Sequence, residues 1–188
     1  MCGYDRRFLI FVAGLLVSLA ACTGPGASPQ QPCTVTFSQQ AANNLLQRIA
    51  QQAAVRGKPV TITATNDEVS SLLDQYLTKA KLDNPNDVIP LNHPTVCFQG
   101  GQMALYGAIQ WGTNSTVDGL ITLSASVSAG KPVFTVDQIQ LGPVSVPPDL
   151  SNEVARVINQ AVSEYVNQIT LSDIKMQNGQ LTLTGQVQ

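Results

Sequence analysis

Two segments of this chain repeat one pattern of glycines and apolar residues. Residues 98–110 (FQGGQMALYGAIQ) align with residues 176–188 (MQNGQLTLTGQVQ), and both keep a turn glycine, alternating apolar positions and a later glycine. Alternation around a Gly-Gly or Asn-Gly turn predicts a β-hairpin, and each copy follows a segment with helical spacing. The pattern therefore predicts two units, each a helix followed by a hairpin, that share one sheet. Chance similarity is the alternative, because turn glycines and alternation occur in many hairpins.

Three segments have the apolar spacing of amphipathic helices. The first covers residues 38–55 and has a thin apolar stripe, the second follows a capping box formed by Thr65 and Glu68, and the third covers residues 149–168. The predicted stripes are Ala41, Leu45, Leu46, Ile49 and Ala53 in the first helix, Val69, Leu72, Leu73, Tyr76, Leu77 and Ala80 in the second, and Leu150, Val154, Val157, Ile158, Ala161, Val162, Tyr165 and Val166 in the third.

Shorter segments alternate with the period of two that is typical of strands. The predicted strands are residues 58–63, 95–98, 103–111, 117–127, 133–141, 170–176 and 180–187. Residues 81–94, rich in Asn, Asp and Pro, are predicted to be a connection. The fold class expected from this order is α+β, with a curved antiparallel sheet wrapped around amphipathic helices as a half barrel.

The predicted central strands almost lack charge. Within residues 88–130 the only charged side chain is Asp118, whereas a sheet face in water normally carries charged residues and an exposed edge often carries Lys. One face of a central strand holds Met103, Leu105, Ile109 and Trp111. We expect a concave sheet that packs on the helices and leaves an apolar groove for an acyl chain. The alternative is a closed core with a Ser- and Thr-rich exterior.

The first 22 residues have the layout of an export signal. Arg6 and Arg7 precede an apolar stretch at residues 8–21, which is shorter than the roughly 20 residues of a membrane-spanning helix. The stretch ends in the sequence LAAC at residues 19–22, which resembles a bacterial lipobox. This resemblance implies a signal peptide at residues 1–21, acylation of Cys22, and a flexible linker through residue 32. An ordinary secretory signal with a chance cysteine is the alternative. The paired arginines also resemble a twin-arginine signal, so the export route stays open.

The part that remains, residues 33–188, is long enough for one domain with a sizeable core. After removal of residues 1–21 the chain carries eight Lys and Arg against eleven Asp and Glu, with no basic cluster. Nucleic acid is therefore not an expected partner. Contact with the membrane is expected through the acyl anchor or apolar surface, because a basic patch for anionic headgroups is missing.

Cys33 and Cys97 are the cysteines left for the folded part. An even pair in an exported chain predicts a disulfide, here joining the segment before the first helix to a strand. Two free buried thiols are the alternative, because sequence does not supply the geometry that a disulfide requires.

No motif in the sequence indicates catalysis or a metal site. The single histidine, His93, is predicted to lie in a loop as a solvated or capping residue. A nucleophile elbow, a zinc-binding helix and a phosphate loop are missing from the sequence, and the carboxylates are scattered. We expect a protein that is not an enzyme and that needs no cofactor and no metal.

Several of these features together resemble the LmeA-like, DUF2993-type envelope lipoproteins, a group placed with the tubular lipid-binding (TULIP) superfamily. The similar features are the lipobox, the strand VTIT at residues 60–63 before an acidic helix start, the pattern GQxxLxG in both hairpins, the break at residues 141–148, and the closing sequence NGQLTLTG. The similarity covers about residues 59–188. It implies a helix wrapped by a curved antiparallel sheet, with phospholipid or another acyl lipid in an apolar groove, and no catalytic residues. The first helix, Cys33 and Cys97 lie outside the pattern.

The expected function is that of a membrane-anchored lipoprotein on the extracytoplasmic side of a bacterial envelope, which binds or handles an acyl lipid by burial alone. The rival expectation is a scaffold lipoprotein with a closed core that meets a partner protein. The candidate groove residues are Val69, Leu72, Leu73, Tyr76, Leu105, Leu123, Val157, Ile158 and Tyr165.

Overall fold

The computed structural model describes residues 29–83, 91–111, 115–142, 146 and 149–188. Its helices are α1 (Gln39–Ala53), α2 (Asn66–Asp83) and α3 (Leu150–Val166), close to the predicted segments. The predicted capping box is present: Glu68 N–H donates to Thr65 Oγ1 over 3.3 Å, and Thr65 N–H donates to Glu68 Oε2 over 3.0 Å. Ser38 caps α1 by accepting a hydrogen bond from Ala41 N–H. Each cap pairs backbone donors that a helix start would leave free.

The strands form two antiparallel sheets. The strands are β1 (Pro59–Thr65), β2 (Leu91–Gln99), β3 (Gln102–Trp111), β4 (Ser115–Ser128), β5 (Lys131–Leu141), β6 (Ile169–Gln177) and β7 (Gln180–Val187). One sheet has the order β1-β7-β6 and the other β2-β3-β4-β5. The α+β class with antiparallel sheets and helices is thus confirmed. The prediction that both helix-then-hairpin units share one sheet is wrong, because the two hairpins meet at their turns and not along their edges.

The two repeated hairpins are joined by a reciprocal pair of hydrogen bonds at these turns. Gly101 N–H donates to Met176 O over 3.0 Å, and Gly179 N–H donates to Phe98 O over 2.9 Å. Gly101 and Gly179 are equivalent in the sequence repeat, as are Phe98 and Met176. If each residue is replaced by its equivalent in the other copy, one hydrogen bond becomes the other. The two hairpin turns therefore contact each other through equivalent residues. Both glycines have a positive φ (84° and 80°), which explains why the repeat keeps glycine there.

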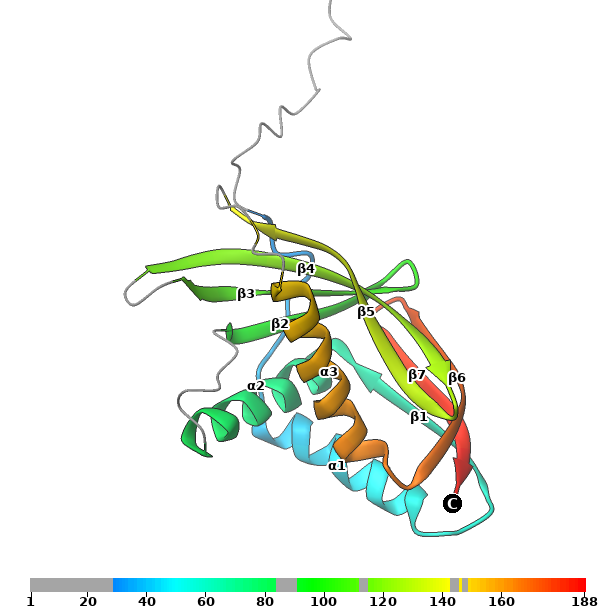
Figure 1. Cartoon of the computed structure of the whole chain (residues 1–188). Coiled ribbons are helices and arrows are strands. Elements are labelled where there is room, and N and C mark those ends of the chain that lie inside the picture. Colours follow the sequence, from blue (N-terminus) through cyan, green and yellow to red (C-terminus); the bar gives the residue numbers. More distant parts are fainter. Residues whose placement is uncertain (1–28, 84–90, 112–114, 143–145, 147–148) are drawn as a thin grey trace, which may run out of the picture.

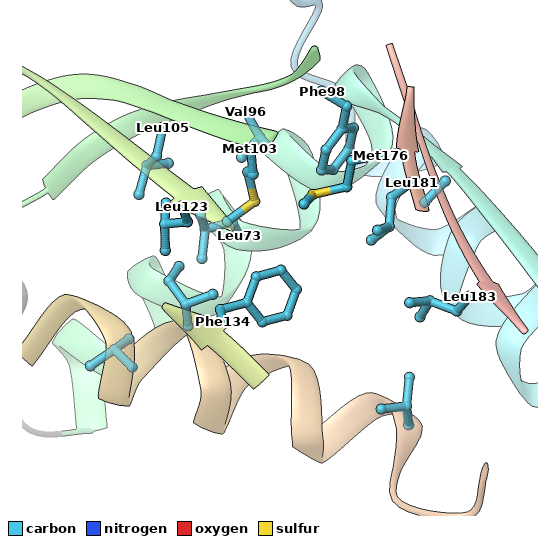
Figure 2. Packing of buried hydrophobic residues seen from close by; sticks show 14 of the residues in the cluster. Leu73, Val96, Phe98, Met103, Leu105, Leu123, Phe134, Met176, Leu181 and Leu183 are labelled. Carbon is cyan, nitrogen blue, oxygen red and sulfur yellow. The ribbon is translucent and has the colours of Figure 1, made fainter. Parts of the chain in front are cut away.

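Figure 1 shows the helices gathered on one side of the two sheets. The four-stranded sheet arches over α2 and α3, and the three-stranded sheet stands beside β5. Helix α2 packs on β2, α3 packs on β5, and α1 packs on α2 and β1. Side chains from both sheets and from the helices meet in one continuous core, in which Phe98 and Met176 point into the same region (Figure 2).

Strand β2 begins earlier than the sequence pattern predicts. Residues 91–94 were expected in a connection, but they belong to β2, and the pairing with β3 is irregular between Asn92 and Thr95. His93 occupies this irregularity with a φ of 46° and an 82% exposed side chain. The prediction of a loop histidine is therefore corrected to a histidine in a strand bulge. Pro94 obscured the strand, since Pro lowers strand preference away from bulges and edges.

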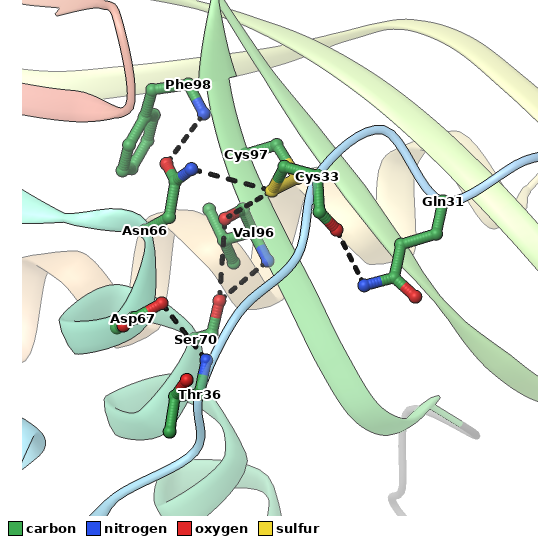
Figure 3. The surroundings of a disulfide bond; sticks show 9 residues. All are labelled: Gln31, Cys33, Thr36, Asn66, Asp67, Ser70, Val96, Cys97 and Phe98. Atoms are coloured by element: carbon green, nitrogen blue, oxygen red, sulfur yellow. Dashed lines mark hydrogen bonds between the residues drawn. A yellow bond between two sulfur atoms is a disulfide. The ribbon is translucent and has the colours of Figure 1, made fainter.

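The disulfide between Cys33 and Cys97 is present and joins the segment before α1 to β2, as predicted (Figure 3). The two Cα atoms lie 6.0 Å apart. The edge of β2 is covered beside it, because Phe98 N–H donates to Asn66 Oδ1 over 3.0 Å and Val96 N–H donates to Ser70 Oγ over 2.8 Å. Helix α2 and the N-terminal segment thus cover a strand edge that would otherwise be open to pairing with another chain.

The central sheet has one clearly apolar face. Met103, Leu105 and Ile109 are buried, as predicted, whereas Ala104, Tyr106 and Ala108 on the other face are half-buried. The side chain of Trp111 lies outside the described residues, as do the predicted signal peptide and Cys22. In the part of the chain that the structure describes, no helix has the length and hydropathy needed to cross a bilayer.

Candidate functional site

An apolar pocket of about 60 Å³ lies between α2 and α3, with β2 and β3 beneath it. The backbones of α2 and α3 approach each other less closely than those of α1 and α2, so side chains fill the space between them. The pocket is lined by Val69, Leu72, Leu73, Tyr76, Val96, Met103, Ile158, Ala161, Val162 and Tyr165. Its wall therefore consists of aliphatic side chains, one thioether and two tyrosines.

Six of the nine candidate groove residues line this pocket: Val69, Leu72, Leu73, Tyr76, Ile158 and Tyr165. Leu105 lies instead on a smaller cavity deeper in the core. Leu123 and Val157 line neither space: Leu123 is 0% exposed, and both side chains belong to the packed core. Both residues are buried on apolar faces, and periodicity does not separate core from pocket lining, so their place in a lipid groove stays a prediction.

The deeper cavity measures about 10 Å³ and is lined only by aliphatic side chains. It is bounded by Leu73, Leu77, Leu91, Leu105, Ile109, Ile121, Leu150, Val154 and Ile158. Leu73 and Ile158 line both spaces, so these two side chains form the partition between them.

The pocket opens beside Tyr76 and Tyr165, where a wider hollow of about 390 Å³ begins. The hollow is lined by Gln75, Tyr76, Lys79, Ala80, Glu164 and Tyr165, so its character changes from apolar to polar. Burial raises the pKa of the Tyr76 hydroxyl, and the nearby Glu164 carboxylate raises it further against a smaller opposing effect of Arg156. Burial and then Glu164 likewise raise the pKa of Tyr165. Both phenols therefore remain protonated at neutral pH and can donate hydrogen bonds.

The side chains that line the pocket support burial of apolar groups. His93 lies near Asp74, with Nδ1 3.2 Å from Oδ1, but neither residue lines the pocket. Within the described residues, His, Cys, Asp and Glu form no group of three or more that could hold a metal ion.

Four pocket residues were not among the predicted candidates: Val96, Met103, Ala161 and Val162. Ala161 and Val162 belong to the predicted stripe of the third helix, and Met103 to the predicted apolar strand face. The periodic spacing of these three residues predicts that they face inward. It does not show which residues of each apolar stripe line the pocket and which are packed in the core. That distinction depends on the angle at which α2 and α3 cross, which is set by tertiary packing.

Comparison of the chain with protein-family models and with curated proteins finds no match in either.

Proposed function

We propose that this protein is a membrane-anchored lipoprotein on the extracytoplasmic side of a bacterial envelope, and that it binds phospholipid or another acyl lipid between α2 and α3 without catalysing a reaction. The apolar pocket that opens at two tyrosines carries this proposal. Apolar walls with an amphipathic mouth suit a ligand whose tail is hydrocarbon and whose other end meets water.

The driving force for such binding is burial of methylene groups, worth about 0.8 kcal/mol each. The pocket of about 60 Å³ is smaller than the roughly 150 Å³ cavity that holds a benzene molecule in an engineered core. An acyl chain therefore requires α2 and α3 to separate, because even the pocket and the deeper cavity of about 10 Å³ together are too small. The wide spacing of the two helices favours such a movement, because fewer backbone contacts are lost.

The finer assignment of the fold, a half barrel similar to the tubular lipid-binding superfamily and to LmeA-like lipoproteins, is part of the same proposal. It is supported by two equivalent helix-then-hairpin units and by antiparallel sheets on one side of the helices. A pocket enclosed by these two unit helices is consistent with a lipid site at the centre of the molecule.

The test is to fill the pocket without disturbing the core. Ala161 is 6% exposed and lines the pocket, so Ala161→Leu places extra methyl groups in the empty space. We expect Ala161→Leu to lower retention of a fluorescent fatty-acid probe at least tenfold and to change the melting temperature little. The matched control is Ala42→Leu in α1, where Ala42 is 0% exposed and does not line the pocket. Overpacking at Ala42 should lower the free energy of unfolding by about 1–3 kcal/mol. The fraction of this variant that remains folded should bind the probe with the affinity of the wild type.

Two outcomes would contradict the proposal. If Ala161→Leu and Ala42→Leu lowered probe binding in proportion to their loss of stability, the loss of binding would be explained by damage to the core and not by filling of the pocket. A wild-type protein that retains no probe, and that carries no lipid in native mass spectra after purification from membranes, would favour the scaffold function. That second candidate is supported by the outer face of β3 and β4, which holds the half-buried Ala104, Tyr106 and Leu120 and a single charged residue, Asp118.

A further inference from the structure

The polar hollow at the mouth of the pocket carries one positive and one negative side chain. Lys79 projects from α2 and Glu164 from α3, and both line the hollow together with Tyr76 and Tyr165. Among the described residues, neither Lys79 nor Glu164 takes part in a salt bridge. The nearby Arg156 is already engaged, since it forms a salt bridge with Glu153 and donates to Gln160. The unpaired charges at the mouth are therefore one cation and one anion.

We propose that the lipid held between α2 and α3 has a zwitterionic headgroup, with its phosphate at Lys79 and its ammonium at Glu164. This inference rests on the proposed function and names the class of lipid that the same site takes. Hydrocarbon enters the pocket beyond Tyr76 and Tyr165, and the headgroup stays in the hollow of about 390 Å³.

Charge complementarity distinguishes this headgroup from the others. A purely anionic headgroup would pair with Lys79 but would place its charge near the Glu164 carboxylate, which repels it. A purely cationic headgroup would meet the opposite conflict at Lys79. A zwitterion satisfies both side chains at once, and like-charge repulsion then acts against each competing class.

The two tyrosines complete the polar mouth. Glu164 lies close enough to both phenols to raise the pKa of each, after the larger effect of burial. The hydroxyls consequently keep their protons and can donate to phosphate oxygens, while the aromatic rings border the hydrocarbon below. The same residues thus mark the level at which the ligand changes from apolar to polar.

The experiment measures displacement of a bound fluorescent fatty acid from the full-length protein by single-chain lipids that differ only in headgroup. For the wild type we expect lysophosphatidylethanolamine to displace the probe at a concentration at least tenfold lower than lysophosphatidylglycerol. Free glycerophosphoethanolamine, which lacks the acyl chain, should displace it at least a hundredfold less well, because it has no hydrocarbon to bury.

Charge exchange at the mouth provides the decisive variants. Glu164→Lys should reverse the order in favour of the anionic lipid, and Lys79→Glu should weaken both phospholipids. The double exchange of Lys79→Glu with Glu164→Lys should restore the preference for the zwitterion at least in part, since both charges are again present. Lys131→Glu, an exposed change at the first residue of β5, is the matched control and should leave the order unchanged.

Each contrary result has a distinct meaning. If the wild type binds the probe but all four variants rank the headgroups alike, or if the wild type prefers the anionic lipid, the headgroup inference is overturned and the proposed function stands. If the wild type retains no acyl probe, both fail together.

Discussion

At the scale of single residues, Gly185 shows how a sheet position can exclude every side chain. A Cβ atom at Gly185 would lie 2.4 Å from the carbonyl oxygen of Thr170 and 3.0 Å from Cα of Leu171. Both atoms belong to the backbone of the neighbouring strand β6, where the pairing is irregular between Leu171 and Asp173. A side chain at position 185 would therefore force the strands apart, because backbone atoms, unlike side chains, cannot adopt another rotamer.

We accordingly predict that Gly185→Ala lowers the free energy of unfolding by about 1–3 kcal/mol. The control is Thr61→Ala, an exposed change on β1 in the same sheet, which should stay within about 0.5 kcal/mol of the wild type. Urea denaturation followed by circular dichroism measures both values. Equal stabilities for the two variants would mean that β6 and β7 leave room for a side chain at Gly185.

Glu68 is the residue at which pH should change stability. Burial opposes ionisation of Glu68, but hydrogen bonds from Arg48 and Thr65 together outweigh burial and lower the pKa below its ordinary value of 4.5. Arg48 binds both carboxylate oxygens at 2.8 Å and also donates to Thr63 O. A carboxyl group with a lowered folded-state pKa stabilises the fold above pH 4.5, and this contribution disappears as the pH falls through the lowered pKa.

The corresponding prediction concerns Glu68→Gln, which keeps a capping-box side chain but cannot ionise. At pH 7 this variant should lose about 1 kcal/mol, a modest value because Arg48 is 40% exposed and water screens the pair. Below pH 4.5 its stability should fall less steeply than that of the wild type. If the difference in the free energy of unfolding between the two proteins stayed constant from pH 7 to pH 3, the role given to Glu68 would be contradicted.

At the scale of elements, α2 and α3 each protect a strand edge. Asn66 and Ser70 of α2 accept hydrogen bonds from the edge of β2. Asn159 of α3 accepts from Phe134 N–H over 2.8 Å and donates to Phe134 O over 2.9 Å at the edge of β5. Each helix thus pairs polar backbone groups that would otherwise be free, and both edges of the four-stranded sheet are covered in part.

The disulfide adds to this arrangement by fixing the N-terminal segment on β2. It closes a sequence separation of 64 residues, which predicts a stabilisation of about 4 kcal/mol in the chain-entropy model. We expect the double variant of Cys33→Ser with Cys97→Ser to lose a stability of this order, and reduction of the wild type to have the same effect. Thiol titration of the denatured, unreduced protein should find neither residue reactive. Reactive thiols at both positions would rule out the bond.

At the scale of the whole molecule, the proposed function combines two parts: the proposed anchor at Cys22 and the pocket between α2 and α3. The acylated cysteine would be joined to the domain by a linker of ten residues, with a reach of roughly 15–20 Å. The folded domain would then stay close to the lipid surface from which a ligand could enter.

Removal of the anchor should therefore change location and leave the fold intact. In Cys22→Ser the sulfur atom that would carry the acyl group is absent, so we expect the protein in the soluble fraction or as an unprocessed precursor. The folded domain should keep the melting temperature and probe binding of the wild type after detergent extraction. Normal partition of Cys22→Ser into the membrane fraction would end the lipoprotein interpretation.

The sequence by itself determined the features that depend on neighbouring residues. The helix starts at Ser38 and Thr65, the hairpin turns at Gly101 and Gly179, and the inward faces of the strands all follow from caps, turn glycines and periodicity. These signals are readable because their energetics involve residues only a few positions apart. The disulfide was also predictable, since Cys33 and Cys97 are the only cysteines within the described residues and form an even pair.

Only the tertiary structure decided how these elements are combined. It divided the strands into two sheets joined at the turns of the repeated hairpins, and it drew residues 91–94 into β2 through a bulge. It also separated Leu73 and Ile158, which border the pocket, from Leu123, which fills the core. These residues share one apolar pattern, and their environments differ because helix crossing and sheet curvature arise from contacts between segments far apart in the chain.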